Sequence, residues 1–138
     1  MKRSYRLDWF PEDGAAYPVR IFLMKDEVMV TLDTSGDSLH KRGYRLLTSK
    51  APLTETLAAA LIMLTPWKKD RILVDPFCGS GTFPIEAAMM AANIAPGMNR
   101  TFTAEKWTNL IPRQLWYDTV EEAQELVNTD IEVDIQGY

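Results

Sequence analysis

The stretch "VDPFCGSGT", Val74 to Thr82, constrains the fold of this chain more than any other. It follows the short apolar run "RILVD" and precedes "TFPIEAAMMAANIA", which is apolar nearly all round. An unbroken apolar run of this length is typical of a strand buried on both faces of a parallel sheet. Gly79 and Gly81 can adopt positive φ and leave room for a close neighbour. A strand, a glycine turn and a helix in succession predict backbone N–H groups and a positive helix end beside a ligand.

Two familiar glycine-rich turns fit this stretch poorly. A Walker A loop ends in Gly-Lys-Ser/Thr, whereas Gly81 is followed by Thr82 and phenylalanine. A dinucleotide fingerprint needs a third glycine where Pro84 stands, which weakens that interpretation. The carboxylate of Asp75 favours a cationic ligand instead, such as the ammonium and sulfonium groups of S-adenosylmethionine. Asp75 could equally only cap the turn through its own backbone, so a purely structural turn stays an alternative.

The hydrophobic period changes along the chain from that of strands to that of helices. It predicts a β-hairpin over Val19–Leu32, turning at Lys25–Glu27. Pro52 and Pro66 bound a predicted helix whose Leu53, Leu57, Leu61 and Leu64 share one face. The elements predicted after it are a strand at Arg71–Asp75, a helix at Thr82–Ile94, an amphipathic helix from Pro112 and a strand at Ile131–Gln136. Their order is that of a βαβ crossover, so we expect the two strands to be adjacent and parallel in an α/β fold.

Composition sets broad limits. With 138 residues, 46% of them hydrophobic, the chain can build one compact core. No apolar run approaches the ~20 residues that span a bilayer, and the N-terminus lacks a signal-peptide pattern. The single cysteine, Cys78, fits a reducing cytoplasm, and we interpret it as a small turn residue because no histidine neighbours it. His40 is the one histidine, so we expect no metal site built on histidines.

One basic cluster stands out against a net charge of −4. It consists of Lys41, Arg42 and Arg45 in the polar segment "HKRGYR". Such a cluster in a connector is suited to hold a nucleic-acid phosphate, although a solvated linker has the same composition.

Three consecutive segments resemble one known family. "DPFCGSGTFPIEAA" resembles the first cofactor-binding motif of the class I RNA guanine-N2 methyltransferases that carry a THUMP domain. "LDTSGDSLHKRGYRLLTSKAPLTETLAAALI" before it and "IAPGMNRTFTAEKW" after it are similar to the flanks of that motif. The resemblance implies a partial Rossmann-like methyltransferase fold behind a β-hairpin. Residues 1–35 would be the last strands of a THUMP-like RNA-binding domain, 36–48 a connector, and 49–138 the first part of the S-adenosylmethionine-binding domain.

The resemblance also implies a cofactor site with two sides. The methionine side of S-adenosyl-L-methionine would be lined by Asp75, Pro76, Phe77, Cys78, Gly79, Ser80, Gly81 and Thr82. The opposite side would be approached by Ser49, Lys50, Ala51, Pro52 and Leu53. The implied reaction is methyl transfer to RNA, at guanine N2 of ribosomal RNA, in the cytoplasm and without a metal. The alternatives are a DNA or transfer-RNA methyltransferase acting on adenine or guanine, and a nucleotide- or RNA-binding module without chemistry.

The family's catalytic signature, Asn or Asp followed by Pro-Pro and an aromatic residue, does not occur in the 138 residues. Two parallel strands also leave the next edge of the sheet open. We therefore expect the chain to correspond to roughly the middle third of such an enzyme and to be inactive by itself.

Overall fold

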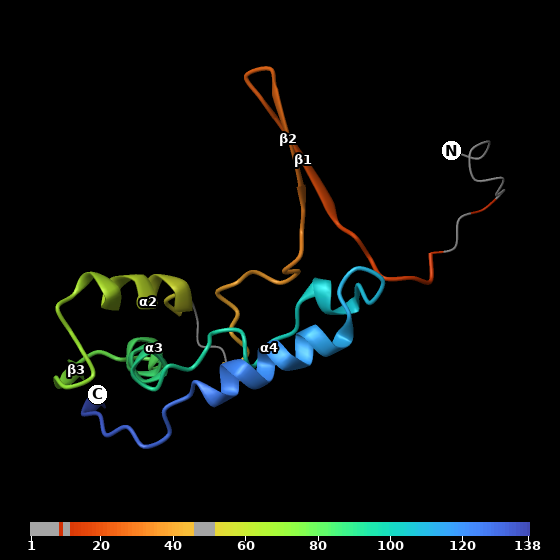
Figure 1. The fold of residues 1–138 in the computed structure, drawn as a ribbon. Coiled ribbons are helices and arrows are strands. Elements are labelled where there is room, and N and C mark those ends of the chain that lie inside the picture. The colour runs from red at the N-terminus through yellow and green to blue at the C-terminus, as the bar shows by residue number, and fades with distance from the viewer. Residues whose placement is uncertain (1–8, 10–11, 46–51) are drawn as a thin grey trace.

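The computed structural model describes residues 9, 12–45 and 52–138. The N-terminal feature is an antiparallel hairpin of β1 (Val19–Met24) and β2 (Glu27–Leu32). Lys25 and Asp26 connect the strands with φ of 50° and 63°, and positive φ at both central residues matches a type I′ turn. The predicted hairpin is thus confirmed. It projects away from the helices in Figure 1, and apolar side chains such as Ile21 and Val30 are exposed.

The predicted parallel strand pair is also confirmed. β3 (Leu73–Asp75) pairs with β4 (Ile135–Gly137), with Leu73 opposite Ile135. Both strands are shorter than predicted. One reason is that the Arg71 carbonyl accepts a hydrogen bond from the Trp67 indole at 2.9 Å, which occupies a group the strand would have used.

The described residues contain the helical segments α2 (Glu55–Leu64), α3 (Thr82–Ala91), the 3₁₀ turn η1 (Thr103–Lys106) and α4 (Arg113–Glu125). Helix α3 ends before the predicted Ile94 because Asn93 takes φ of 55°. The amide of Asn93 donates to the Met90 carbonyl, and that of Ile94 to the Met89 carbonyl. This pair of bonds is a Schellman motif with asparagine in the left-handed position.

Helix α2 differs from its prediction in two ways. It begins at Glu55 with Thr54 as N-cap, so Pro52 lies outside it. Its buried face carries Ala58, Ala59 and Ile62, whereas the predicted leucine face is exposed at Leu57, Leu61 and Leu64. The predicted helix is thus confirmed, but the face that it buries is the one that carries the alanines. Alanines allow α2 to approach α3 closely, and Figure 1 shows the two helices stacked with α3 nearest β3.

The connector between hairpin and helices packs onto the segment that follows α3. The Arg100 guanidinium donates to the carbonyls of Ser35, Asp37, Ser38 and Lys41 at 2.5 to 3.3 Å. Trp107, 3% exposed, stacks on Tyr17 and donates its indole N–H to the Ala16 carbonyl at 2.8 Å. The connector is thus a packed element. Within the part of the chain that the structure describes, every helix is too short or too polar to cross a membrane.

Candidate functional site

The glycine turn joins the end of β3 to the start of α3. Gly79 and Gly81 have φ of 54° and 75°, and Gly81 is the N-cap of α3. The turn is closed by the Gly81 amide, which donates to the Cys78 carbonyl at 2.8 Å. Among the residues that the structure describes, a Cβ at Gly79 would meet nothing within 4 Å, and one at Gly81 would meet only the Ile85 side chain. Gly79 therefore borders space that a ligand could occupy at close range, whereas a side chain at Gly81 would lie against Ile85.

Asp75 caps the turn, as one of the two alternatives anticipated. Its Oδ1 accepts a hydrogen bond from the Phe77 amide at 3.1 Å, which is the geometry of an Asx turn. A carboxylate can accept about four hydrogen bonds, so this cap leaves capacity for a cationic group. Phe77 itself points into solvent with 90% of its surface exposed, and Cys78 is half-buried.

The two predicted sides of the cofactor site are joined by one side chain. Arg45 Nη2 donates to Thr82 Oγ1 at 2.7 Å and to the Leu53 carbonyl at 3.4 Å. The structure thus brings Leu53, just before α2, to the first residue of α3. Three residues predicted for the same side, Ser49, Lys50 and Ala51, lie outside the described residues.

The three residues of the predicted basic cluster have different environments, because Arg42 and Arg45 are buried whereas Lys41 is exposed. Arg42 forms an ion pair with Glu86 at 3.2 Å, and Arg45 forms one with Glu55 at 3.5 Å. These four side chains are 2% to 14% exposed, because the connector lays both arginines against α2 and α3. The structure therefore does not favour Arg42 and Arg45 as phosphate ligands. Lys41 is exposed, and its role in phosphate binding stays a prediction.

Glu86 is the most deeply buried charged residue of this network. It is 1% exposed, accepts a hydrogen bond from the Tyr44 hydroxyl at 2.9 Å and pairs with Arg42. Burial raises the pKa of Glu86, an effect that the Tyr44 hydrogen bond and the Arg42 charge oppose. Burial also raises the pKa of Tyr44, and the neighbouring Glu86 raises it further. Both partners of Glu86 are thus side chains of the connector.

Sequence reasoning missed the network of these two ion pairs. A signal was present, because Glu55 and Glu86 are the acids of two otherwise apolar helices and Arg42 and Arg45 are nearby cations in the connector. A charge inside an apolar helix needs a partner, since an unpaired buried charge is strongly unfavourable.

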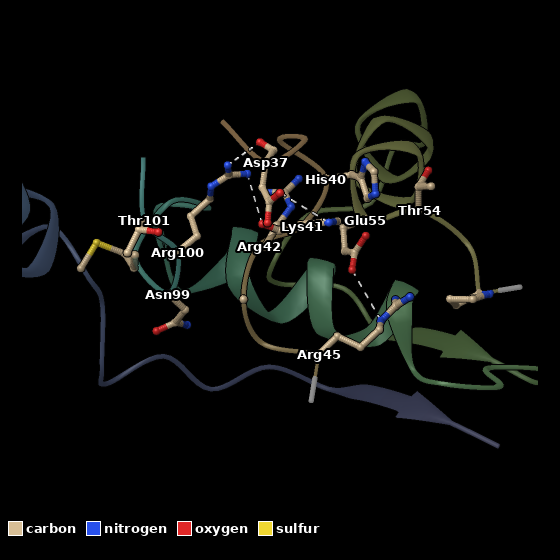
Figure 2. A pocket seen from close by; sticks show the side chains of 13 residues that line it. Asp37, His40, Lys41, Arg42, Arg45, Thr54, Glu55, Asn99, Arg100 and Thr101 are labelled. Atoms are coloured by element: carbon tan, nitrogen blue, oxygen red, sulfur yellow. Dashed lines mark hydrogen bonds and ion pairs between the residues drawn. The ribbon is translucent and has the colours of Figure 1, made fainter. Parts of the chain in front are cut away.

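A cavity of about 970 Å³ lies between the connector, the first turn of α2 and the segment after α3. Figure 2 shows Arg45 directed at Glu55 along one wall and Arg100 directed at Asp37 along another. The lining residues that the structure describes include Arg42, Arg45 and Arg100 but no residue of the glycine turn. These guanidinium groups are already engaged by carboxylates or backbone carbonyls, and a fourth cation of the lining, Lys41, lies 3.6 Å from the Asp37 carboxylate.

The parallel strands β3 and β4, with the glycine turn and helix α3 following β3, are the arrangement of a partial Rossmann-like α/β fold, in which the turn lies at the carboxyl end of β3. Residues 42–137 match the family model of the RMKL-like methyltransferase domain. The chain belongs to this family, which agrees with the methyltransferase resemblance in its broad terms.

Several individual proteins are similar to the chain. Over 123 residues it is 54% identical to "Putative RNA methyltransferase YpsC" of Bacillus subtilis, with 89% of the chain and 32% of that protein covered. A Listeria monocytogenes crystal structure, described as a "predicted N6-adenine-specific DNA methylase", superposes with a TM-score of 0.91 at 50% identity. The structure of "SMU.472, a putative methyltransferase complexed with SAH" superposes with a TM-score of 0.89 at 45% identity. Both alignments cover 99% of the chain and 36% of the other protein. The chain thus spans about a third of the length of these relatives.

Proposed function

We propose that this chain forms the cofactor-binding part of an S-adenosylmethionine-dependent methyltransferase that acts on RNA. The observation that carries the proposal is the glycine turn, in which Gly79 borders open space among the described residues just before α3, in a chain of a methyltransferase family. A relative in complex with SAH, the product left after methyl transfer, supports the cofactor. A relative named as an RNA methyltransferase supports the substrate class.

The residues of this chain would bind and orient the cofactor. The backbone N–H groups of the turn and the N-terminus of α3 would approach it without a side chain in between. The free acceptor capacity of Asp75 suits its ammonium group, because opposite charges attract more strongly in a site that excludes water. S-adenosylmethionine supplies an activated methyl group. The accepting amine then needs alignment with the S–CH₃ bond more than it needs covalent assistance.

For the substrate we propose the exocyclic N2 of a guanine in ribosomal RNA. The support is the similarity of the segments on both sides of the glycine turn to guanine-N2 methyltransferases. The name of the Listeria relative favours a second candidate, N6 of adenine in DNA. To decide between them, the full-length protein is incubated with methyl-labelled cofactor and with ribosomal RNA, transfer RNA or DNA. Chromatography of the digested nucleosides then identifies the labelled base, and label in N6-methyladenine from DNA would contradict the guanine proposal.

The cofactor proposal is tested by filling the open space beside the turn. In the full-length protein, Gly79→Val and Gly81→Val should abolish binding of S-adenosylmethionine in calorimetric titration. Gly79→Asn should also abolish binding. Because asparagine tolerates positive φ, loss of binding in this variant would come from the side chain that fills the ligand's space and not from backbone strain. Gly14→Val is the control, because Gly14 is exposed and a Cβ there meets nothing within 4 Å.

Unchanged affinity in the turn variants would mean that the turn is only structural. Binding of ATP or RNA by a wild-type protein that ignores S-adenosylmethionine would instead indicate a binding module without chemistry.

A further inference from the structure

Arg45 links three segments of the chain, because it lies in the connector and its guanidinium contacts the starts of α2 and α3. It belongs to the connector, its Nη2 contacts Thr82 Oγ1 at 2.7 Å and the Leu53 carbonyl at 3.4 Å, and its Nε faces Glu55 Oε1 at 3.5 Å. Thr82 and Glu55 are 3% and 5% exposed, so water competes little for these contacts. The planar fork of N–H groups in arginine allows one side chain to engage several acceptors in fixed directions.

The contact to Thr82 acts on the glycine turn itself. Thr82 directly follows Gly81 and opens helix α3. Because its hydroxyl oxygen accepts from Arg45, its proton is free to point at Ser80 Oγ, 3.4 Å away. The guanidinium is therefore linked directly to Thr82 and, through the Thr82 hydroxyl, to Ser80, the two polar residues that flank Gly81. The contacts with Leu53 and Glu55 attach the same group to the beginning of α2.

We propose that Arg45 is a positioning residue for the cofactor site, which holds the glycine turn at a fixed distance from the start of α2. This inference rests on the function proposed above. A binding site whose two sides are already held in place loses less conformational entropy when the ligand binds, and this increases affinity. Arg45 itself contacts the turn and not the ligand, so its effect is transmitted through Thr82.

The chain contains a matched control in the second buried arginine. Arg42 also pairs with a carboxylate of an apolar helix, Glu86, and its side chain is 10% exposed against 14% for Arg45. Arg42 has no contact with the turn among the described interactions. Replacing either arginine removes a comparable ion pair, but only the change at Arg45 removes the link to Thr82.

The test compares Arg45→Met, Arg45→Lys and Arg42→Met in the full-length protein. Titration of S-adenosylhomocysteine gives the affinity, and urea unfolding gives the stability. Arg45→Met should weaken binding about tenfold or more, the range expected when a hydrogen bond from a charged group is lost. Arg45→Lys should recover little of this, because an ammonium group cannot reproduce the fork. Arg42→Met should lower the urea midpoint as much while it changes affinity by less than about threefold, since stability and site geometry are separate readouts.

Thr82 provides a second pair of variants that does not remove a charge. Thr82→Ser keeps the hydroxyl that accepts from Arg45 and should bind more tightly than Thr82→Val, which lacks it. The double variant Arg45→Met/Thr82→Val should be no weaker than Arg45→Met alone, because both changes interrupt the same link.

The outcomes distinguish the inference from the function on which it rests. If wild-type protein does not bind S-adenosylhomocysteine, the proposed function fails and this inference fails with it. If wild type binds but Arg42→Met and Arg45→Met lose affinity equally, or the Arg45 and Thr82 effects are additive, only the positioning role is overturned.

Discussion

Gly43 is the position where one added methyl group should damage the fold most. Gly43 lies in the connector and has φ of +86°. Its two neighbours both contact Glu86, Arg42 through an ion pair and Tyr44 through a hydrogen bond. A Cβ built there would lie 1.7 Å from the carbonyl oxygen of Asn99 and 2.5 Å from its carbonyl carbon. Both atoms are backbone, so no side-chain rotation can relieve the overlap. In Gly43→Ala the connector must therefore move away from the segment after α3.

The cost of Gly43→Ala has two parts. Left-handed backbone at a residue with a Cβ costs about 1–2 kcal/mol, and forcing an extra carbon into a packed contact costs about 1–3 kcal/mol. The free energy of unfolding should thus fall by about 2–5 kcal/mol, a large share of the ~5–15 kcal/mol typical of a protein. Any separation of Arg42 from Glu86 would add to this loss, because a broken buried ion pair is strongly destabilising.

Urea unfolding of a glycine series isolates the steric part. Gly79→Ala shares the positive φ, at 54°, but its Cβ meets nothing within 4 Å, so it should cost only the strain of about 1–2 kcal/mol. Gly14→Ala has neither problem and should leave the unfolding midpoint almost unchanged or slightly raised. If Gly43→Ala unfolds at the same urea concentration as Gly79→Ala, the close packing of the connector on Asn99 is refuted.

Two further predictions concern the same connector. Burial raises the pKa of Glu86 above its ordinary value of 4.5, so the native state binds this proton more tightly than the unfolded chain does. The stabilisation from that proton is fully present below about pH 4.5 and is lost as the pH rises through the native pKa. The difference in unfolding free energy between wild type and Glu86→Gln, measured by urea unfolding across this window, should therefore shrink with rising pH; a flat difference contradicts the shift. Arg100→Lys should lower the unfolding free energy by about 1–3 kcal/mol, because an ammonium group cannot serve all the carbonyls that Arg100 holds. Unfolding at the wild-type urea concentration would show that these bonds contribute nothing net.

The parts of the fold that could be predicted are those that follow from patterns of neighbouring residues in the sequence. Alternation over Val19–Leu32 produced the hairpin, and the order of strand, glycine turn and helix from Arg71 onward produced the parallel pair. The buried face of α2 could not be predicted in this way. Leu57 and Ala58 both fit a helical period, and the choice between them depends on how closely α3 approaches, which is a tertiary property.

The candidate site, too, could be predicted from the sequence only where its signal is local. The glycine turn was visible because Gly79 and Gly81 are chemically distinctive. The contact from Arg45 to Thr82 spans 37 residues of sequence, and nothing in the local pattern marks it. Composition suggested a solvated basic cluster, whereas the fold directs Arg42 and Arg45 inward to carboxylates on two helices.

The grip of Arg100 on the connector has a mechanical consequence. The chain leaves the hairpin through the connector, and Arg100 holds the connector by its backbone carbonyls. A tilt of the hairpin would therefore pivot near these bonds. Six residues per strand make an arm of about 20 Å at ~3.3 Å per residue. A tilt of about 10° at this pivot would displace the far end by about 3.5 Å over that length. The position of the hairpin tip relative to the glycine turn therefore depends on how firmly Arg100 holds the chain after β2 and Trp107 holds the chain before β1.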